Sequence, residues 1–407
     1  METAINQQTE LKFYQLYVLY SQLYIVNYIS QWGDFMVNSN PSTFESFEIC
    51  NPVKVVYGVG KLNEVGKYIS AKRVLVICDP VVQRLGYVDT LQHIFPECEI
   101  FSGIEPNPSC TLVNNIVDAY SNASIDGIIG IGGGSSLDTS KAVSALLSNG
   151  GRIEDYLLGT KKFSSRLPLV LIPTTAGTGS EVTNVGVFTH ESIKKPMTSD
   201  QFWADTAVID PQLTYSMPPR VTASTGLDAL THAIESYWAK SSQPYTEGLA
   251  LRATKMIFEN LINSINGDKD ARNNMALAAT IAGIAFSQTR TTAAHAISFP
   301  LTSFYGIEHG LAVVLTLPRL VLWTYPHVRR KMDEMLMYLG MKDIEELSMK
   351  IENLVSESGF PTRLREYNVK FEELEDIAKV SMEANIIKLT PGDMNYEDVL
   401  QLLKAIY

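Results

Sequence analysis

Short apolar runs alternate with amphipathic stretches between residues 50 and 217. Four runs rich in Val, Ile and Leu predict strands, at 53–58, 73–79, 127–134 and 168–173. Because these runs are apolar at nearly every position, we expect strands that are covered on both faces. Three stretches between them predict helices, at 62–70, 108–122 and 136–149. Strands that alternate with helices indicate a parallel sheet of the βαβ type.

Beyond residue 218 the strand pattern is replaced by apolar positions at helical spacing. The segment 217–240 begins with Pro and Ser/Thr residues and continues as a helix. Further helical runs lie at 245–265, 270–288, 310–324, 330–355, 370–383 and 396–407. The sequence therefore predicts a leading extension (1–45), an α/β domain with a parallel sheet (46–217) and an all-helical domain (218–407). Since no long linker separates the last two, we expect a ligand at their junction.

The leading extension contains a segment, 11–32, that is dense in Tyr, Leu and Ile. It has no basic start or small-residue cleavage site, which argues against a secretory signal. Four amide side chains interrupt the run, so a membrane span is not expected (Gln15, Gln22, Asn27 and Gln31). Two interpretations stay open: an amphipathic helix for docking or oligomer contacts, or an extension upstream of a natural start at Met36. The second is slightly favoured.

Composition narrows the function classes. The 407 residues carry 33 basic and 44 acidic side chains, a net charge of −11, which argues against broad contact with nucleic acid. Four cysteines without a CxxC pair indicate neither a disulfide framework nor a thiolate zinc site. We therefore expect a globular enzyme of the cytoplasm. Apolar helix faces favour a homodimer.

A glycine-rich segment, GIGGGSSLDTSK at 130–141, directly follows one predicted strand and precedes a helix. Glycine lets the backbone approach a ligand closely, and the N-terminus of the helix attracts an anion. Ser135, Ser136 and Asp138 stand at positions where we expect helix capping. The spacing matches neither GxGxxG nor a Walker loop. The segment predicts a phosphate cradle of another lineage, with an ordinary tight turn as the alternative.

A second polar loop, PTTAGTGSEVT at 173–183, also follows a predicted strand. Two such loops at strand ends fit a dinucleotide. Asp79 ends another strand, where a carboxylate could accept from a ribose 2′-hydroxyl and repel a 2′-phosphate. This position favours NAD(H) over NADP(H). A turn or capping role for Asp79 is an equally open alternative.

Three of the six histidines lie in an informative pattern with one aspartate. Asp228 and His232 are four residues apart, so they project from one helix face. His295 and His309 follow, and we expect Pro300 and Gly306 to break regular structure between them. One carboxylate and three imidazoles suit Fe(II), Zn(II), Mn(II) or Ni(II). Taken singly, each histidine is more commonly packed or solvated; the remaining His93, His190 and His327 are expected at the surface.

As an ordered set, these motifs resemble the iron-containing (group III) alcohol dehydrogenase family. The matching stretches are GGGSSLDTSK, IPTTAGTGSEVT, GLDALTHAIESY and His295 followed by YGIEHG, with EPNPS at Asn107 and GFPTRLREYNV similar as well. The resemblance covers roughly residues 50–407 and implies NAD(P)-dependent alcohol oxidation or aldehyde reduction with one divalent metal, Fe(II) or Zn(II). It implies metal ligation by Asp228, His232, His295 and His309. For the cofactor it implies contacts from Asp79, Asn107, Gly132, Gly133, Gly134, Ser135, Asp138, Thr174, Thr175 and Thr178.

One departure from the family concerns the position four residues after the third ligand. Many members carry a histidine there, whereas this chain has Phe299. The sequence around His295 is similar to that of the branch that reduces phosphonoacetaldehyde to 2-hydroxyethylphosphonate. Arg290 could pair with a dianionic phosphonate and is counted among the catalytic residues. Lys194 and Lys195 are weaker candidates, and a helix-surface ion pair is the alternative for Arg290.

Three other functions stay open. The first is a general short-chain alcohol or diol dehydrogenase of the same family. The second is a lyase similar to dehydroquinate synthase, which uses NAD transiently; such enzymes resemble this architecture but use a Glu/His/His metal set and many basic residues, so Asp228 argues against it. The third is a non-catalytic binding protein, which the intact set of four candidate ligands disfavours. We expect a small alcohol or aldehyde substrate, no nucleic acid and no membrane span.

Overall fold

The computed structural model describes residues 46–191 and 193–407 of the chain. The predicted segment 1–45, with its helix for docking or its upstream extension, lies outside the described residues. Residues Ile49–Tyr407 form one unit in which the α/β part and the helical part pack directly.

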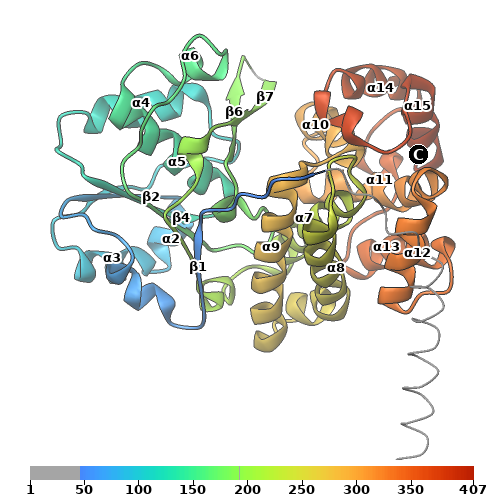
Figure 1. Ribbon diagram of the computed structural model, residues 1–407, viewed down its shortest axis with the longest axis horizontal. Coiled ribbons are helices and arrows are strands. Elements are labelled where there is room, and N and C mark those ends of the chain that lie inside the picture. The colour runs from blue at the N-terminus through green and yellow to red at the C-terminus, as the bar shows by residue number, and fades with distance from the viewer. Residues whose placement is uncertain (1–45, 192) are drawn as a thin grey trace, which may run out of the picture. The chain divides into compact units, whose positions relative to one another are not determined.

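A six-stranded parallel sheet organises the α/β part (Figure 1). Its strands are arranged in the order β1-β8-β5-β4-β2-β3, and every neighbouring pair is parallel. Their bounds are β1 Lys54–Tyr57, β2 Val74–Cys78, β3 Glu99–Phe101, β4 Gly127–Gly132, β5 Leu169–Pro173 and β8 Thr206–Ile209. The direction of strand succession reverses between β2 and β4, so the carboxyl ends of these two strands flank a crevice of the kind that binds nucleotides.

Successive residues of each central strand contribute to two different cores. In β2, Leu75 and Ile77 pack with α4 and α5 on one face, whereas Val74 and Val76 pack with α3 on the other. Figure 1 shows α4 and α5 on one side of the sheet and α3 on the opposite side. These helices are α2 Pro80–Arg84, α3 Tyr87–Ile94, α4 Cys110–Tyr120, α5 Gly134–Asn149 and α6 Ile153–Leu157. Burial on both faces explains why the central strands β2, β4 and β5 are apolar at nearly every position. The expectation of coverage on both faces is wrong for β1, which is an edge strand and largely exposed.

Several local predictions in this part are wrong. The expected helix at 62–70 is a 3-10 helix, η1 Lys61–Lys67, which contains Gly66 and whose start is held by Asp210 through the backbone N–H groups of Gly60 and Leu62. Strands β3 and β8, of three and four residues, were not expected, because runs this short show no clear apolar pattern. An antiparallel hairpin, β6 Val185–His190 with β7 Ile193–Thr198, was not expected because its polar residues interrupt any apolar run.

Every regular element from Pro219 to the end of the chain is an α-helix or a 3-10 helix. The α-helices are α7 Pro219–Trp238, α8 Pro244–Ile265, α9 Lys269–Thr289, α10 Ala293–Tyr305, α11 His309–Thr324, α12 Arg329–Leu339, α13 Ile344–Glu357, α14 Leu374–Met382 and α15 Tyr396–Ala405. The prediction of a parallel-sheet part followed by a helical part is therefore confirmed. The run 330–355 divides into two helices, because Gly340 takes a left-handed conformation that ends α12.

The expected break at Pro300 is also wrong. Pro300 lies inside α10 and is buried, and the helix continues to Tyr305, where left-handed Gly306 ends it. Proline removes one helical hydrogen bond, but packing of the neighbouring Ile297 and Leu301 into the helical core compensates for it. Helix α7 runs through this core with both faces covered. None of the helices described is long and apolar enough to cross a bilayer.

Candidate functional site

The glycine loop lies at the carboxyl end of β4, where it turns into α5. Gly132 has a φ of 148°, and a Cβ there would lie 2.5 Å from Oγ of Ser136 and 3.0 Å from Oδ2 of Asp79. Only glycine fits both the conformation and the space. The backbone therefore enters α5 close to Asp79 at the end of β2, and the N–H groups of the first helical turn have no side-chain cap from Gly133.

The second polar loop lies against the first. The backbone N–H of Thr174 donates to the carbonyl of Gly132 at 3.0 Å, because β5 pairs with β4. A Cβ added at Gly133 would meet the side chain of Thr175, and a Cβ added at Gly134 would meet the side chain of Thr178. Both threonines and both glycines keep part of their surface accessible. The structure thus brings the predicted glycines and threonines to one partly open surface.

Two further residues of the predicted cofactor set border this surface. Asn107 has a left-handed φ of 57°, and its N–H donates to Oγ of Ser135 at 3.2 Å. Asp79 caps α2, since its Oδ1 accepts from the N–H groups of Val81 and Val82. Capping accounts for one carboxylate oxygen of Asp79, while the other faces Gly132.

Asp138 and the expected capping residues need a correction. Helix α5 begins at Gly134, and its N-terminal boundary residue, Gly133, has no side chain that could cap it. Asp138 lies one turn inside the helix, and its two oxygens accept from Oγ of Ser180 at 2.6 Å and from the N–H of Val187 at 2.9 Å. Through these two hydrogen bonds, Asp138 holds the second loop and the start of β6 in place.

Lys141 was missed as a site residue although it lies within the glycine motif. Its side chain has no exposed surface, and its Nζ donates to Ser180, Thr183 and the carbonyl of Val185. Burial lowers the pKa of Lys141 to about 8, against the opposing effect of Asp138. The lysine therefore fastens the second loop and the start of β6 to α5. The feature that identifies Lys141 is a buried charge with three hydrogen-bond acceptors, and only the folded structure shows it.

The four predicted metal ligands converge around one carboxylate oxygen. Oδ1 of Asp228 lies 3.8 Å from Nδ1 of His232, 3.7 Å from Nε2 of His295 and 3.7 Å from Nε2 of His309. Asp228, His232 and His295 are almost fully buried, whereas the side chain of His309 is 37% exposed. We call this group the cage. It is closed on three sides and accessible beside His309.

Close packing of two helices places His309 in the cage. Gly310, the second residue of α11, packs against α7 so tightly that a Cβ would lie 1.9 Å from the carbonyl oxygen of Ser224 and 3.1 Å from Cβ of Asp228. Glycine at 310 therefore lets the first turn of α11 approach Asp228. The ring of His232 stacks between Phe286, at 4.2 Å between centroids, and His295, at 4.6 Å. Helices α7, α9, α10 and α11 thus all contribute to the cage or its wall.

Glu235 supports the cage and was missed in the sequence. Its carboxylate is fully buried and accepts from Nδ1 of His295 at 2.5 Å, from Oγ1 of Thr292 at 2.5 Å and from the N–H of Ala294 at 2.8 Å. Because the carboxylate of Glu235 accepts from Nδ1 of His295, Nε2 is the ring nitrogen that faces the cage. Residues 228, 232 and 235 share one face of α7, so helical spacing could have identified Glu235.

The protonation states of the cage follow from burial and neighbouring charges. Burial lowers the pKa of His232 to about 4, despite the nearby Asp228 carboxylate. Burial likewise lowers the pKa of His309. For His295, burial acts in the lowering direction, but Glu235 and Asp228 outweigh it and raise its pKa to about 9. The three imidazoles hold the pKa of Asp228 below its usual value against the effect of burial.

The residues present fit a divalent metal ion. Within the described part of the chain, three buried atoms of the cage have no hydrogen-bond partner: Oδ1 of Asp228, Nδ1 of His232 and Nε2 of His295. Burial of a polar atom without a hydrogen-bond partner costs free energy, so three such atoms around one point fit a site for a metal ion. Ligand atoms of Asp228, His295 and His309 lie within 4.8 Å of one another. One carboxylate and three imidazoles form a donor set that Fe(II) and Zn(II) accept.

The three basic candidates for substrate contact lie in different surroundings. Lys194 is close enough for its charge to interact with both Asp228 and His309, and burial lowers its pKa. The charge of Lys195, the next residue on β7, instead acts on the pKa of Cys110. Arg290 has a left-handed φ of 66° and donates to Oδ1 of Asn184 at 3.3 Å. Lys194 is therefore a candidate cation near the cage, alongside Arg290.

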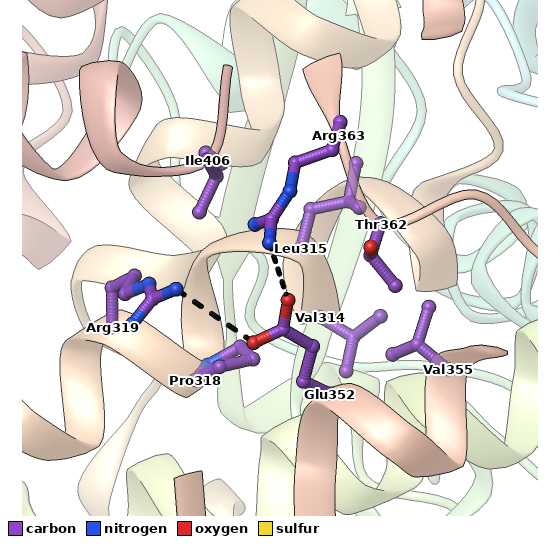
Figure 2. Close-up of a pocket in the computed structure, with 9 residues that line it drawn as sticks. All are labelled: Val314, Leu315, Pro318, Arg319, Glu352, Val355, Thr362, Arg363 and Ile406. Atoms are coloured by element: carbon purple, nitrogen blue, oxygen red, sulfur yellow. Dashed lines mark ion pairs between the residues drawn. The ribbon is translucent and has the colours of Figure 1, made fainter. Parts of the chain in front are cut away.

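A pocket on the opposite part of α11 does not compete with this site. Figure 2 shows Arg319 and Arg363 converging on Glu352, at 3.7 Å and 2.9 Å, with apolar side chains around them. Its free volume is about 10 Å³, which is enough for one water molecule at most. The pocket is therefore too small for a substrate.

Comparisons with known proteins agree with this arrangement. The model for iron-containing alcohol dehydrogenase matches residues 52–211, and the model for the Fe-containing alcohol dehydrogenase family, C-terminal, matches residues 222–407. Long-chain-alcohol dehydrogenase 1 of Geobacillus thermodenitrificans is 33% identical over 84% of this chain and 91% of its own length. Sulfoacetaldehyde reductase of Bilophila wadsworthia is 32% identical over 86% of this chain and 97% of its own length.

Solved structures share the fold. The crystal structure of sulfoacetaldehyde reductase from Bifidobacterium kashiwanohense in complex with NAD+ superposes with a TM-score of 0.86 at 30% identity, covering 89% of this chain and 99% of that one. The two family models together span nearly all of the α/β and helical parts. This chain is an oxidoreductase that belongs to the iron-containing alcohol dehydrogenase family.

Proposed function

We propose that this enzyme uses NADH to reduce a short aldehyde that carries an anionic group, with phosphonoacetaldehyde as the specific candidate. In this proposal Asp228, His232, His295 and His309 hold one Fe(II) or Zn(II) ion. The substrate class is supported by the electrostatic interaction of Lys194 with Asp228 and His309, together with the relatives named sulfoacetaldehyde reductase.

The cage residues supply a preorganised binding site for the ion. When bound, the metal polarises a carbonyl oxygen and NADH supplies the hydride. Glu235 keeps His295 in the ligating tautomer, and the stacked ring of Phe286 holds His232 in orientation. His309, the exposed member, borders the space that a substrate enters. Phe299 cannot transfer protons, so we assign proton delivery to water or a ribose hydroxyl.

The cofactor preference rests on the two loops and on Asp79. Gly132, Gly133, Gly134 and Ser135 would receive the pyrophosphate at the start of α5, and Thr174, Thr175 and Thr178 would border it. Oδ2 of Asp79 lies beside Gly132, and in this proposal it accepts from the adenine ribose. A carboxylate there disfavours a 2′-phosphate, which supports NAD(H) over NADP(H).

Lys194 supports recognition of an anionic tail. Its partial burial among cage residues increases the gain from pairing with a phosphonate or sulfonate. Arg290 lies half-buried at Asn184 and serves as a second candidate cation. Relatives named sulfoacetaldehyde reductase reduce an aldehyde of this chemical type, which further supports the class.

The test compares phosphonoacetaldehyde, sulfoacetaldehyde and propionaldehyde with NADH and Fe(II)-loaded enzyme. We expect the anionic aldehydes to be preferred, and Lys194→Ala to lower kcat/KM for them by roughly 10- to 100-fold, as for loss of a charged hydrogen bond, with little effect on propionaldehyde. Lys195→Ala is the matched control and leaves kcat/KM unchanged. An equal loss for charged and neutral aldehydes would reject the anionic substrate.

A general alcohol dehydrogenase is the second candidate, because one of the relatives is a long-chain-alcohol dehydrogenase. It is favoured if propionaldehyde and longer neutral aldehydes outperform both anionic ones. The same measurements with the Arg290→Ala variant assign the roles of the two cations. Loss of activity toward anionic aldehydes in that variant alone would restore Arg290 as the main contact.

We also propose a cytoplasmic homodimer. All four cysteines are free thiols, as in a reducing compartment. Strand β1 is an edge of the sheet and exposes Val55 and Tyr57, which favours pairing with a second copy. Light scattering at low protein concentration measures the oligomeric state directly.

A further inference from the structure

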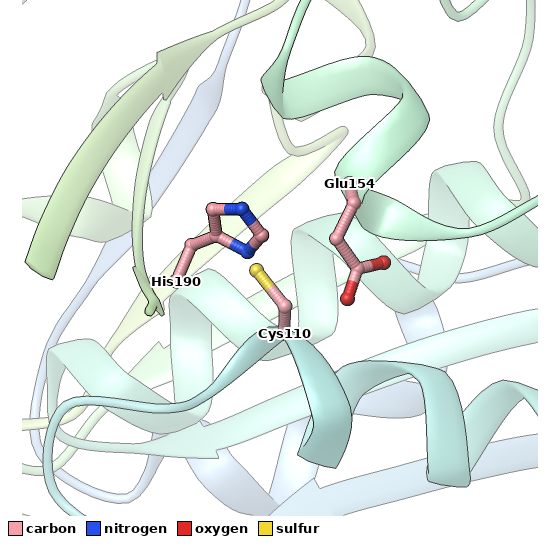
Figure 3. A group of neighbouring side chains, drawn as sticks. All are labelled: Cys110, Glu154 and His190. Carbon is pink, nitrogen blue, oxygen red and sulfur yellow. The ribbon is translucent and has the colours of Figure 1, made fainter. Parts of the chain in front are cut away.

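A second group of metal-binding side chains lies in the α/β part, away from the cage residues. Cys110 is the first residue of α4, Glu154 is the second residue of α6 and His190 is the last residue of β6. One ligand atom from each lies within 4.8 Å of the other two. Figure 3 shows the thiol, the carboxylate and the imidazole turned toward one another from these three elements.

We propose that Cys110, Glu154 and His190 form a second divalent-metal site, with a preference for Zn(II). Thiolate, imidazole and carboxylate are the ligands that zinc takes in proteins. Zinc bonds of 2.0–2.3 Å place tetrahedral ligand atoms about 3.3–3.8 Å apart. Side-chain shifts of about 1 Å therefore close the site, comparable to what the cage itself requires.

The surroundings hold the three ligands in position. Nδ2 of Asn114, one turn after Cys110 on α4, donates to both oxygens of Glu154, at 3.1 Å and 2.8 Å. The Oδ1 atom of the same Asn114 accepts from the N–H of Ile153 and so ties the start of α6 to α4. This is the kind of outer hydrogen bond that orients a ligating carboxylate.

The position of His190 is set by its neighbour. The N–H of Thr189 donates to the carbonyl of Pro108 at 2.8 Å, and its Oγ1 donates to the carbonyl of Asn107 at 3.1 Å. The backbone of β6 is therefore attached to the segment that leads directly into Cys110. Cys110 is 3% exposed, while Glu154 and His190 are half-buried, which leaves one side open for a water ligand.

Burial and neighbouring charges set the protonation of the Cys110 thiol. Burial raises the pKa of Cys110 to about 11 and Glu154 adds to this, while Lys195 acts in the opposite direction. The thiol is consequently protonated until a metal displaces its proton, as at other zinc sites. The bound ion would join α4, α6 and the β6–β7 hairpin. None of the three ligands has a role in the proposed reduction, so the second site stands whichever aldehyde is the substrate.

Cobalt(II) binding tests the proposal, because thiolate-to-cobalt charge transfer gives an ultraviolet band that the cage cannot produce without cysteine. Metal-free enzyme is titrated with Co(II), and bound metal is counted after gel filtration. We expect two ions per chain and a thiolate band. His309→Ala should lower metal binding at the cage and keep the band. His190→Ala should bind one ion and lose most of the band.

Cys110→Ser should abolish the band, whereas Cys98→Ser, which changes a half-buried cysteine elsewhere, should retain it. Circular dichroism verifies that each variant is folded, and His190→Asn replaces His190→Ala if the alanine variant is not. One ion per chain without a band in the wild type overturns the second site. A band that survives in Cys110→Ser overturns it as well, because another thiol then binds the metal.

Discussion

Glu235 accepts a hydrogen bond from Nδ1 of His295 across 60 residues of sequence, and the two side chains meet fully inside the helical core. The same carboxylate accepts from Thr292, which in turn accepts from the indole N–H of Trp238. A chain of buried hydrogen bonds thus ends on a ligand of the proposed metal site. Such networks fix the orientation of a ligand more firmly than packing alone.

Glu235→Gln should therefore weaken metal binding. The amide removes the negative charge that favours the ligating tautomer, and its NH₂ group cannot accept from Thr292 or Ala294. We expect the Kd for Fe(II) or Zn(II) to rise by roughly 10- to 100-fold. Competition with a chelator measures it. Glu308→Gln is the control, since that carboxylate lies next to His309 in sequence but pairs with Arg220; an equal rise in both variants would contradict the specific role of Glu235.

His309→Ala should abolish aldehyde reduction while NADH binding stays largely intact. The imidazole is the exposed member of the cage, and the cofactor loops lie in the other part of the chain. NADH fluorescence titration and steady-state turnover with added metal give the two readings. Wild-type turnover in this variant would rule out His309 as a ligand.

Gly310→Ala should destabilise the protein and loosen the cage. A methyl group at 310 would overlap the carbonyl of Ser224, so α11 must move away from α7. We expect a loss of about 1–3 kcal/mol in the free energy of unfolding, together with weaker metal binding. Denaturant melts of the metal-free enzyme separate the two effects. Gly248→Ala is the matched control, because this helical glycine of α8 has nothing within 4 Å; there we expect stability to stay equal or rise.

Asp79→Asn should relax the cofactor preference without loss of stability. Asparagine caps α2 as well as aspartate does, but it carries no charge to repel a 2′-phosphate. The ratio of kcat/KM for NADPH to that for NADH should rise. Asp79→Ala separates the roles, because it also removes the cap and should cost about 1 kcal/mol. An unchanged cofactor ratio in both variants would leave Asp79 with capping alone.

Local patterns in the sequence were sufficient for much of the fold. The apolar runs at 73–79 and 127–134 contain strands β2 and β4. A strand buried on both faces is apolar at nearly every position, so it can be recognised from the sequence. Spacing along a single helix was equally informative, since Asp228 and His232 share a face of α7 by helical geometry alone. Pro300 misled the prediction, because packing of α10 outweighs the local preference of proline.

The sequence by itself determined the fold class, the two polar loops at strand ends and the identities of the four candidate ligands, because these depend on contiguous residues or a recurring motif. Only the tertiary structure decided that Glu235 supports His295 and that Cys110 meets His190. Each of these depends on contacts between segments distant in the chain. The side chain that meets such a group is set by how helices and strands pack, which no local spacing encodes.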